Sequence, residues 1–325
     1  MPDSLKKIAT PVKDELVIFD EKFKTSLRSD VKLLNLVTNY ILKQKGKRVR
    51  PILVLQAAAL CGGVNDRTYI GASLVELLHT ATLVHDDVVD DAEKRRGLPA
   101  LNAVWKNKIS ILFGDYLLSR GLSISVDNKE FDFLSIMSTT VKRMAEGELL
   151  QIYKSKKLDI DTETYFKIIS DKTASLLSTC CEIGAVSSSS DPEKQKAMKE
   201  YGENLGIAFQ IRDDILDYIG SFNLFGKEVG GDIKDRKITL PLIYTLENSD
   251  SKTRKEILKN LKKGSKNKKV KEIIEMVKSS GGIDYADKIA REYAQKAREC
   301  LQLFDDSENK TALLELVDFV IDRKK

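Results

Sequence analysis

The sequence predicts an all-α protein, and three observations support this prediction. Only six prolines occur in 325 residues, so long segments lack this helix-breaking residue. Apolar residues recur at steps of three and four through most of these segments, which is the period of an amphipathic helix. Sustained polar and apolar alternation is missing, and no Asn-Gly or Asp-Gly turn joins two β-branched runs. We therefore expect one helical domain spanning residues 1–325.

Composition and charge narrow the class of protein. A chain with 42% apolar residues can bury a sizeable core, so we expect a globular protein. Because 54 basic residues accompany 49 acidic ones, the surface is nearly balanced and a nucleic-acid partner is not indicated. Length alone allows one large domain or two ordinary ones. The stretch from Ser187 to Pro192 is too short for an interdomain linker and predicts a helix start.

Signals for targeting and membrane insertion are weak. The apolar stretches 51–64 and 72–84 are interrupted by polar residues and glycine, so we expect neither to cross a bilayer. Residues 1–20 mix charges with short apolar groups and lack the apolar core of a secretory signal. We expect a cytoplasmic protein with at most peripheral membrane contact.

The cysteines do not form a metal-binding pattern. They stand at positions 61, 180, 181 and 300, without the two-residue spacing of a zinc site. We expect them to be buried free thiols.

Capping signals and apolar periodicity predict the helices in order along the chain. Residues 46–51 predict a helix start after a glycine turn, and residues 72–84 predict an apolar helix that continues into an acidic cluster. Residues 207–217 predict a largely buried helix. Residues 252–278 are dense in lysine and predict a solvated helix pair with a loop at Gly264. The alternative for this segment is contact with an anionic membrane surface.

The clearest amphipathic helix follows Gly282, and a final helix starts at Asp306 and Ser307. The apolar residues of the helix after Gly282 form one stripe along it. The stripe comprises Ala286, Ile289, Ala290, Tyr293, Ala294, Ala297, Leu301 and Phe304.

The first acidic cluster, residues 85–91, contains Asp86, Asp87 and Asp90. Residues four apart on a helix lie about 5–6 Å from each other, so Asp86 and Asp90 share a face. Two like charges at this spacing repel, and a cation between them would remove the repulsion.

The second cluster repeats this spacing with Asp213, Asp214 and Asp217 in an apolar context. Carboxylates near a core are costly unless they are coordinated or paired. Oxygen ligands alone fit several Mg²⁺ ions, each completed by water and phosphate oxygens. The alternative is a pair of solvated acidic turns. A calcium-binding EF-hand is disfavoured because its glycine and distal glutamate are missing.

Basic groups accompany the aspartates. Lys47 and Arg50 stand at a predicted helix start, which suits phosphate oxygens, although an ordinary basic turn is the alternative. Residues 94–96 follow the first cluster, where Arg95 and Arg96 could reach a bound diphosphate or simply neutralise Asp90 and Asp91. The remaining candidates flank the second cluster, each with an ordinary surface position as its alternative, and are Lys172, Thr173, Gly226, Lys227 and Lys237.

Eight motifs follow one another along the chain. In order, they are GKRVRP, ELLHTATLVHDDVVD, RRG, GDYLLSRG, EGELLQ, KTASL, GIAFQIRDDILDY and FGKEVGGDIKDRKITLPLI. Over nearly the whole chain this arrangement resembles the trans-prenyltransferase family of polyprenyl diphosphate synthases. The resemblance implies an antiparallel helix bundle around a central cavity, with the two aspartate motifs facing each other across it. It also implies a homodimer that joins isopentenyl diphosphate to an allylic diphosphate and makes an all-trans product.

The resemblance further implies roles for individual residues. The magnesium ligands would be Asp86, Asp90 and Asp213, with Asp87, Asp214 and Asp217 completing the motifs. The isopentenyl diphosphate site would comprise Lys47, Arg50, His79 and Arg96, although His79 could be an ordinary core histidine. The allylic diphosphate site would comprise Arg95, Lys172, Thr173, Gln210, Lys227 and Lys237. The residues expected to be catalytic are Asp86, Asp90, Asp213, Lys172 and Lys237.

In the same family, residues one turn before the first motif form the cavity floor and limit product length. Here these positions hold the small residues Ala81 and Thr82, so we expect products longer than geranylgeranyl diphosphate. The alternative is that small residues serve helix packing and that Phe113, Tyr116 or Met144 supplies the floor.

Two other functions compete with this one. A class I terpene cyclase shares the first aspartate motif but has less use for a second phosphate site at residues 46–51 and 95–97. A non-catalytic subunit of a heteromeric synthase need not keep both aspartate clusters intact.

Overall fold

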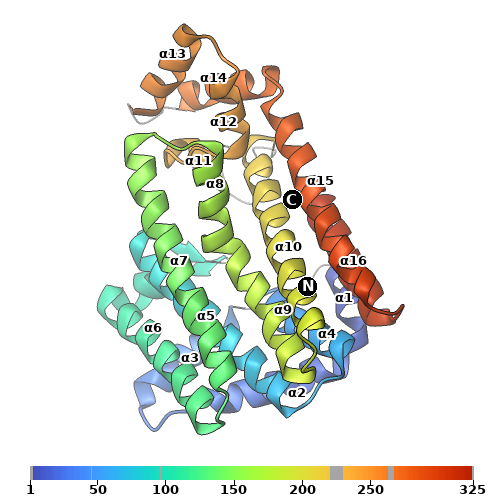
Figure 1. Cartoon of the computed structure of the whole chain (residues 1–325). Coiled ribbons are helices and arrows are strands. Elements are labelled where there is room, and N and C mark those ends of the chain that lie inside the picture. Colours follow the sequence, from blue (N-terminus) through green and yellow to red (C-terminus); the bar gives the residue numbers. More distant parts are fainter. Residues whose placement is uncertain (1–2, 45, 96, 220–229, 263–266, 324–325) are drawn as a thin grey trace. The chain divides into compact units, whose positions relative to one another are not determined.

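The computed structural model describes residues 3–44, 46–95, 97–219, 230–262 and 267–323, and Figure 1 follows them by colour from blue to red. Within these ranges nearly all regular structure is helical. The β structure present there is one hairpin, whose two strands have two residues each. The prediction of an all-α fold is confirmed, whereas the hairpin was not predicted.

The first elements along the chain are α1 (Asp3–Ala9), η1 (Thr10–Val12), α2 (Lys13–Ser26), α3 (Lys32–Lys43), α4 (Val49–Cys61), α5 (Asp66–Val89), β1 (Lys94–Arg95), β2 (Leu98–Pro99) and α6 (Leu101–Asp127). The next are α7 (Phe131–Lys157), α8 (Thr162–Ile169), η2 (Ser170–Ala174), α9 (Ser175–Ser188) and α10 (Pro192–Ile219). The last are α11 (Gly231–Lys234), α12 (Leu240–Glu247), α13 (Ser251–Lys262), α14 (Asn267–Ser279), α15 (Gly282–Cys300), η3 (Leu301–Leu303) and α16 (Glu308–Ile321).

The contacts divide the chain into two compact units, each assembled from separate stretches. Unit 1 comprises Met1–Thr139, Thr179–Lys199 and Leu303–Leu313. Unit 2 comprises Thr140–Ser178, Glu200–Gln302 and Leu314–Lys325. The single domain expected from the sequence stays a prediction.

The core of unit 1 is built on α5, which packs against α4 and α6 (Figure 1). α5 begins with a capping box, in which the Asn65 side chain accepts from the Thr68 backbone N–H and the Thr68 hydroxyl accepts from the Asn65 N–H. Its middle is apolar on most sides and therefore deeply buried. Gly184 brings α9 close to α4, since a Cβ there would lie 2.4 Å from the carbonyl oxygen of Val54.

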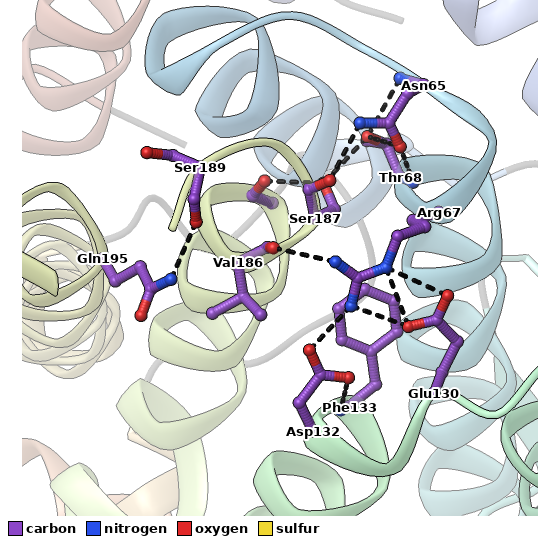
Figure 2. A network of polar contacts seen from close by, with 11 residues as sticks. Asn65, Arg67, Thr68, Glu130, Asp132, Phe133, Val186, Ser187, Ser189 and Gln195 are labelled. Atoms are coloured by element: carbon purple, nitrogen blue, oxygen red, sulfur yellow. Dashed lines mark hydrogen bonds and ion pairs between the residues drawn. The ribbon is translucent and has the colours of Figure 1, made fainter. Parts of the chain in front are cut away.

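Arg67 joins three segments of unit 1 (Figure 2). Its guanidinium donates to Glu130 at 2.8 Å, to Asp132 at 2.6 Å and to the carbonyl of Val186 at 3.4 Å. It also lies over the Phe133 ring, 5.0 Å from the centroid. The start of α5 is thereby tied to the start of α7 and the end of α9.

In unit 2, α12 packs against α15, α14 and α8. The predicted stripe of α15 is largely confirmed, because its four alanines, together with Leu301 and Phe304, are buried. In the unit 1 segment Leu303–Leu313, the Ser307 hydroxyl accepts from the Lys310 backbone N–H and so caps the start of α16. Residues 252–278 form the helix pair α13 and α14, and their Gly264 lies outside the described residues.

Two further expectations need adjustment. Cys61, Cys180 and Cys181 are buried free thiols as predicted, but Cys300 is partly exposed. α6 was not among the apolar stretches considered in the sequence. By length and composition alone it could cross a membrane, and 28% of its most apolar 18-residue stretch is buried.

Candidate functional site

The first aspartate motif lies where α5 ends in unit 1. The Asp90 N–H donates to the Asp86 carbonyl at 2.8 Å, so the two residues are one turn apart as predicted. Both carboxylates stand at a helix C-terminus, where the negative end of the helix dipole adds to their mutual repulsion. The local electrostatics therefore favour a cation at this end of α5.

Asp87 points into the protein and contacts the hairpin. The Arg95 Nε donates to its Oδ1 at 2.6 Å, and only 4% of the Asp87 side chain is exposed. Burial raises the pKa of Asp87, while the hydrogen bond and charge of Arg95 oppose this rise. The sequence suggested that Arg95 binds a diphosphate or neutralises Asp90 and Asp91, but its partner in this structure is Asp87.

The hairpin pairs Lys94 with Pro99 and Arg95 with Leu98, so Arg95 is held by regular hydrogen bonding. The Asn102 side chain donates to the Asp87 carbonyl at 3.1 Å and joins the start of α6 to the same turn. Arg96, expected to bind isopentenyl diphosphate, lies outside the described residues.

The loop between α3 and α4 carries Lys47, which lines a cavity of about 610 Å³ in unit 1. Arg48 adopts the left-handed conformation with φ 57° and pairs with Asp20 at 3.0 Å. Arg50 lies in the first turn of α4, as the sequence predicted. His79 is buried on α5, which is compatible with both interpretations given to it.

The proposed floor residues also lie on α5. Ala81 is fully buried, and the Thr82 hydroxyl donates to the His79 carbonyl at 3.0 Å. Thr80 and Phe113, rather than Ala81, line the same cavity of unit 1 as Lys47. The role of Ala81 and Thr82 in chain length, like that of Phe113, Tyr116 and Met144, stays a prediction.

A second cavity, of about 110 Å³, lies within unit 2 and gathers five predicted residues. These residues are Lys172, Thr173, Gln210, Asp214 and Lys237. Thr173 Oγ1 donates to Gln210 Oε1 at 2.9 Å, and Gln210 Nε2 donates to Asp214 Oδ1 at 2.8 Å. The Tyr165 hydroxyl donates to the other oxygen of Asp214 at 2.7 Å. Residues that are far apart in sequence therefore form one connected wall.

Asp214 is buried within this wall, with 4% of the residue exposed. Burial raises its pKa to about 7, and the nearby charge of Asp232 acts in the same direction. The hydrogen bonds from Tyr165 and Gln210 favour the ionised form and oppose the rise.

The other two aspartates of the second motif have different partners. Asp213 forms an ion pair with Arg323, which follows α16. Asp217 caps α11, because its two carboxylate oxygens accept from the N–H groups of Gly231 at 3.1 Å and Asp232 at 3.0 Å. The three carboxylates lie within two turns of α10 but face three different sets of protein groups.

Two of the three predicted lysines of unit 2, Lys172 and Lys237, are held by carboxylates. Lys172 Nζ lies 2.5 Å from Glu148 and 3.4 Å from the Gln151 amide oxygen. Lys237 Nζ lies 3.7 Å from Asp232 and 3.3 Å from Asp235. Such flexible ammonium groups can turn from these partners to phosphate oxygens. Lys227, with Gly226, lies outside the described residues.

The donor set fits a hard divalent cation. Within the described ranges, no three His, Cys, Asp or Glu side chains are already gathered as a metal site. The oxygens of Asp87, Asp213, Asp214 and Asp217 have protein partners, which are Arg95, Arg323, Tyr165, Gln210 and backbone amides. Each motif nevertheless offers oxygen ligands, which magnesium and calcium prefer. That both motifs share one cavity stays a prediction.

Several residues of the unit 2 cavity were not predicted as site residues. Gln151 and Asp232 line it, and both lie in motifs already noted in the sequence, EGELLQ and GGDIKD. Tyr165 also lines it but lies in no such motif. Motif membership could have indicated the first two, whereas the position of Tyr165 depends on how α8 packs.

The comparisons with known proteins agree with these features. A family model described as polyprenyl synthetase matches residues 31–277. The chain is 35% identical over 322 residues to an all-trans-nonaprenyl-diphosphate synthase from Rhodobacter capsulatus, covering 99% of this chain and 98% of the relative. It is 34% identical to the octaprenyl diphosphate synthase of Escherichia coli, covering 92% and 93%.

A solved structure has the same fold. It is a polyprenyl synthase from Caulobacter crescentus CB15, crystallised with calcium and isoprenyl diphosphate. The TM-score is 0.91 with 33% sequence identity, and the match covers 99% of this chain and 98% of that one.

Proposed function

The chain belongs to the polyprenyl synthetase family, and on this premise we propose that it condenses isopentenyl diphosphate with an allylic diphosphate, head to tail and all-trans. The product is a polyprenyl diphosphate longer than geranylgeranyl diphosphate, as the names of the octaprenyl and nonaprenyl relatives support. The observation that carries the proposal is the unit 2 cavity, which Lys172, Lys237, Thr173 and Gln210 line together with Asp214 of the second motif.

Divalent metal ions belong to this function. The donor chemistry of the two motifs and the calcium in the Caulobacter structure support their use, and we propose magnesium as the ion. Metal ions supply electrostatic stabilisation of the leaving diphosphate when they are bound. Asp86, Asp90 and Asp213 would hold them directly, with Asp87, Asp214 and Asp217 completing the two sets.

The remaining residues bind the two substrates. Isopentenyl diphosphate would contact Lys47, Arg50, His79 and Arg96. The allylic diphosphate would contact Arg95, Lys172, Thr173, Gln210, Lys227 and Lys237. The ammonium groups of Lys172 and Lys237 offset negative charge as the carbon–oxygen bond of the allylic substrate breaks. Apolar walls exclude water, so the allylic cation reacts with the double bond of isopentenyl diphosphate instead of being hydrolysed. The released diphosphate then accepts the proton that restores an allylic product.

We also propose a cytoplasmic homodimer whose protomer is a single domain. The support for a dimer is α6, where Ile111, Leu112, Leu122 and Val126 are exposed apolar side chains on a long helix. A second copy would cover this surface, and light scattering with Leu122→Glu tests the assignment. The expected result is a dimer for the wild type and a monomer for the variant, and a monomeric wild type overturns it.

Activity is tested with the purified chain, labelled isopentenyl diphosphate and primers of several lengths, with and without magnesium. The expected result is a ladder of dephosphorylated products beyond the C20 alcohol, with turnover lost by at least about 100-fold without the ion. Products confined to C20 or shorter would overturn the chain-length part of the proposal.

The same assay separates the competing functions. A terpene cyclase releases hydrocarbon from farnesyl diphosphate alone, whereas a prenyltransferase also needs isopentenyl diphosphate. A non-catalytic subunit gives no product until a second polypeptide is added. Asp213→Asn should abolish product formation, and Asp318→Asn, at an exposed position on α16, is the matched control.

A further inference from the structure

Lys172 and Thr173 lie in an unusual backbone element. η2, Ser170–Ala174, is a single π-helical turn between α8 and α9, and the Ser175 N–H donates five residues back to the Ser170 carbonyl. A π turn inserts one extra residue into a helix; such turns are rare and frequently lie at functional sites. Because it is less favourable than an α-helical turn, it persists only where surrounding groups hold it.

The guanidinium of Arg143, on α7, binds this turn from the side. Its Nε donates to Asp171 Oδ1 at 2.8 Å, and its Nη2 donates to the Ser170 hydroxyl at 2.8 Å. The same Nη2 donates to Glu203 Oε1 on α10 at 2.9 Å. The side chain of Arg143 is 29% exposed and that of Asp171 only 10%. One planar cation thus connects α7, η2 and α10 within unit 2.

Further contacts fix both residues of the turn. Lys167 Nζ donates to the second oxygen of Asp171 at 2.9 Å, and the Ser170 hydroxyl donates to Glu203. The Ser175 hydroxyl donates to the Asp171 carbonyl at 2.6 Å. Asp171 and Ser170 therefore have charged or hydroxyl partners on α7, α8, α9 and α10.

α7 contacts the turn along one stripe at steps of four residues. One turn after Arg143 comes Gly147, where a Cβ would lie 3.0 Å from the Asp171 Cβ and 3.0 Å from the Lys172 nitrogen. The next turn brings Gln151, whose amide oxygen lies 3.4 Å from Lys172 Nζ. Residues at this spacing share a helix face, so α7 supports the turn from Ser170 to Lys172.

We propose that Arg143 is a positioning residue for the allylic diphosphate: with Asp171 and Glu203, it maintains the π turn that directs Lys172 and Thr173 into the unit 2 cavity. The proposal rests on the function given above, in which these two residues bind that diphosphate. If the turn relaxed to an α-helix, the helical register would shift by one residue. Residues on one side of the turn would then rotate by about 100° relative to residues on the other side. Arg143 itself does not touch the substrate.

The test is steady-state kinetics of Arg143→Ala and Arg143→Lys, with the two substrates varied separately. We expect the KM for the allylic primer to rise about tenfold and kcat to fall about tenfold, since small misplacements of binding groups are costly. The KM for isopentenyl diphosphate should stay within about twofold, because the residues proposed to bind it belong to unit 1. Arg143→Lys should restore little, because one ammonium cannot replace a fork of donors.

Lys142→Ala is the matched control. Lys142 precedes Arg143 in the sequence, its side chain is 74% exposed, and its Nζ lies 3.9 Å from Glu146 on the surface. It should leave both KM values unchanged. If Arg143→Ala does not fold, Glu203→Gln keeps the shape of the network and carries the same prediction at about threefold. A wild type without prenyltransferase activity refutes the proposed function itself. An active wild type with equal rises in both KM values, or with unchanged kinetics in all variants, refutes the positioning role alone.

Discussion

Arg323 forms an ion pair with Asp213, the first aspartate of the second motif. Its guanidinium lies over the Phe209 ring, 4.7 Å from the centroid, and only 11% of its side chain is exposed. The Arg212 Nε donates to the Arg323 carbonyl at 3.1 Å, which fixes the backbone beyond α16. A cation from the end of the chain therefore neutralises a carboxylate that we propose as a metal ligand.

Arg323 and a divalent ion should compete for Asp213. We expect Arg323→Ala to lower the half-saturating magnesium concentration about fivefold, equivalent to about 1 kcal/mol for a partly exposed pair. Activity measured against magnesium concentration at saturating substrates gives this value. Arg291→Ala, which removes an exposed pair with Asp287, should not change it. An unchanged or higher magnesium requirement in Arg323→Ala would show that the pair does not compete with the metal.

Replacing Ala81 with Phe should shorten the product. Ala81 is fully buried on α5, one turn before the first aspartate motif. A larger side chain there must therefore displace the atoms that pack around it. Chromatography of the dephosphorylated products measures the change, which we expect to be a loss of two or more isoprene units, roughly 10 carbons. Ile70→Phe, on the same helix, should leave the product length as it is. Identical product lengths in the wild type and Ala81→Phe would exclude this residue as part of the floor.

Asp171 should contribute stability that depends on pH. Burial raises its pKa, but the hydrogen bonds from Arg143 and Lys167 outweigh burial, so the pKa lies below the ordinary 3.8. A carboxyl whose folded pKa is depressed stabilises the folded state above its unfolded pKa. That stabilisation disappears as the pH falls from 3.8 through the folded pKa.

Urea unfolding of the wild type and Asp171→Asn between pH 3 and pH 7 measures this contribution. The variant should be less stable by about 2 kcal/mol at pH 7, and the difference should narrow below about pH 4. A difference that is constant over the whole range would mean that the charge of Asp171 contributes nothing.

Arg67 should matter for stability and not for catalysis. Its removal leaves Glu130, with 8% of its side chain exposed, without its cationic partner (Figure 2). We expect Arg67→Ala to lower the free energy of unfolding by about 2–3 kcal/mol, less than for a fully buried pair because Arg67 is partly exposed. Thermal unfolding and activity at 20 °C are the measurements. Lys6→Ala, which removes the exposed pair with Asp3, should cost less than about 0.5 kcal/mol.

Local patterns predicted several of the helices. The stripe of α15 and the start of α10 at Pro192 follow from spacing and capping within short segments. The one-turn separation of Asp86 and Asp90 is of the same kind, because it depends on helical geometry alone.

Partners across the fold were not predictable in this way. Asp213 and Arg323 are 110 residues apart, and Arg143 lies 28 residues from Asp171 and 60 from Glu203. Nothing in the neighbourhood of Arg143 in the sequence distinguishes it from an ordinary surface arginine. Arg95 was noticed, yet its contact with Asp87 depends on a two-residue hairpin too short to have a periodic signal.

Patterns within the sequence were enough to predict the helical class, several helix starts, and which carboxylates share a helix face. These properties depend on interactions within a few residues, and the 3.6-residue period makes them visible in the spacing of apolar and charged groups. Tertiary structure decided which cation meets which carboxylate, and it stabilised a π turn at Ser170–Ala174 that local preference disfavours. That turn forms because side chains from α7 and α10 bind it, and no local pattern contains their arrangement in space.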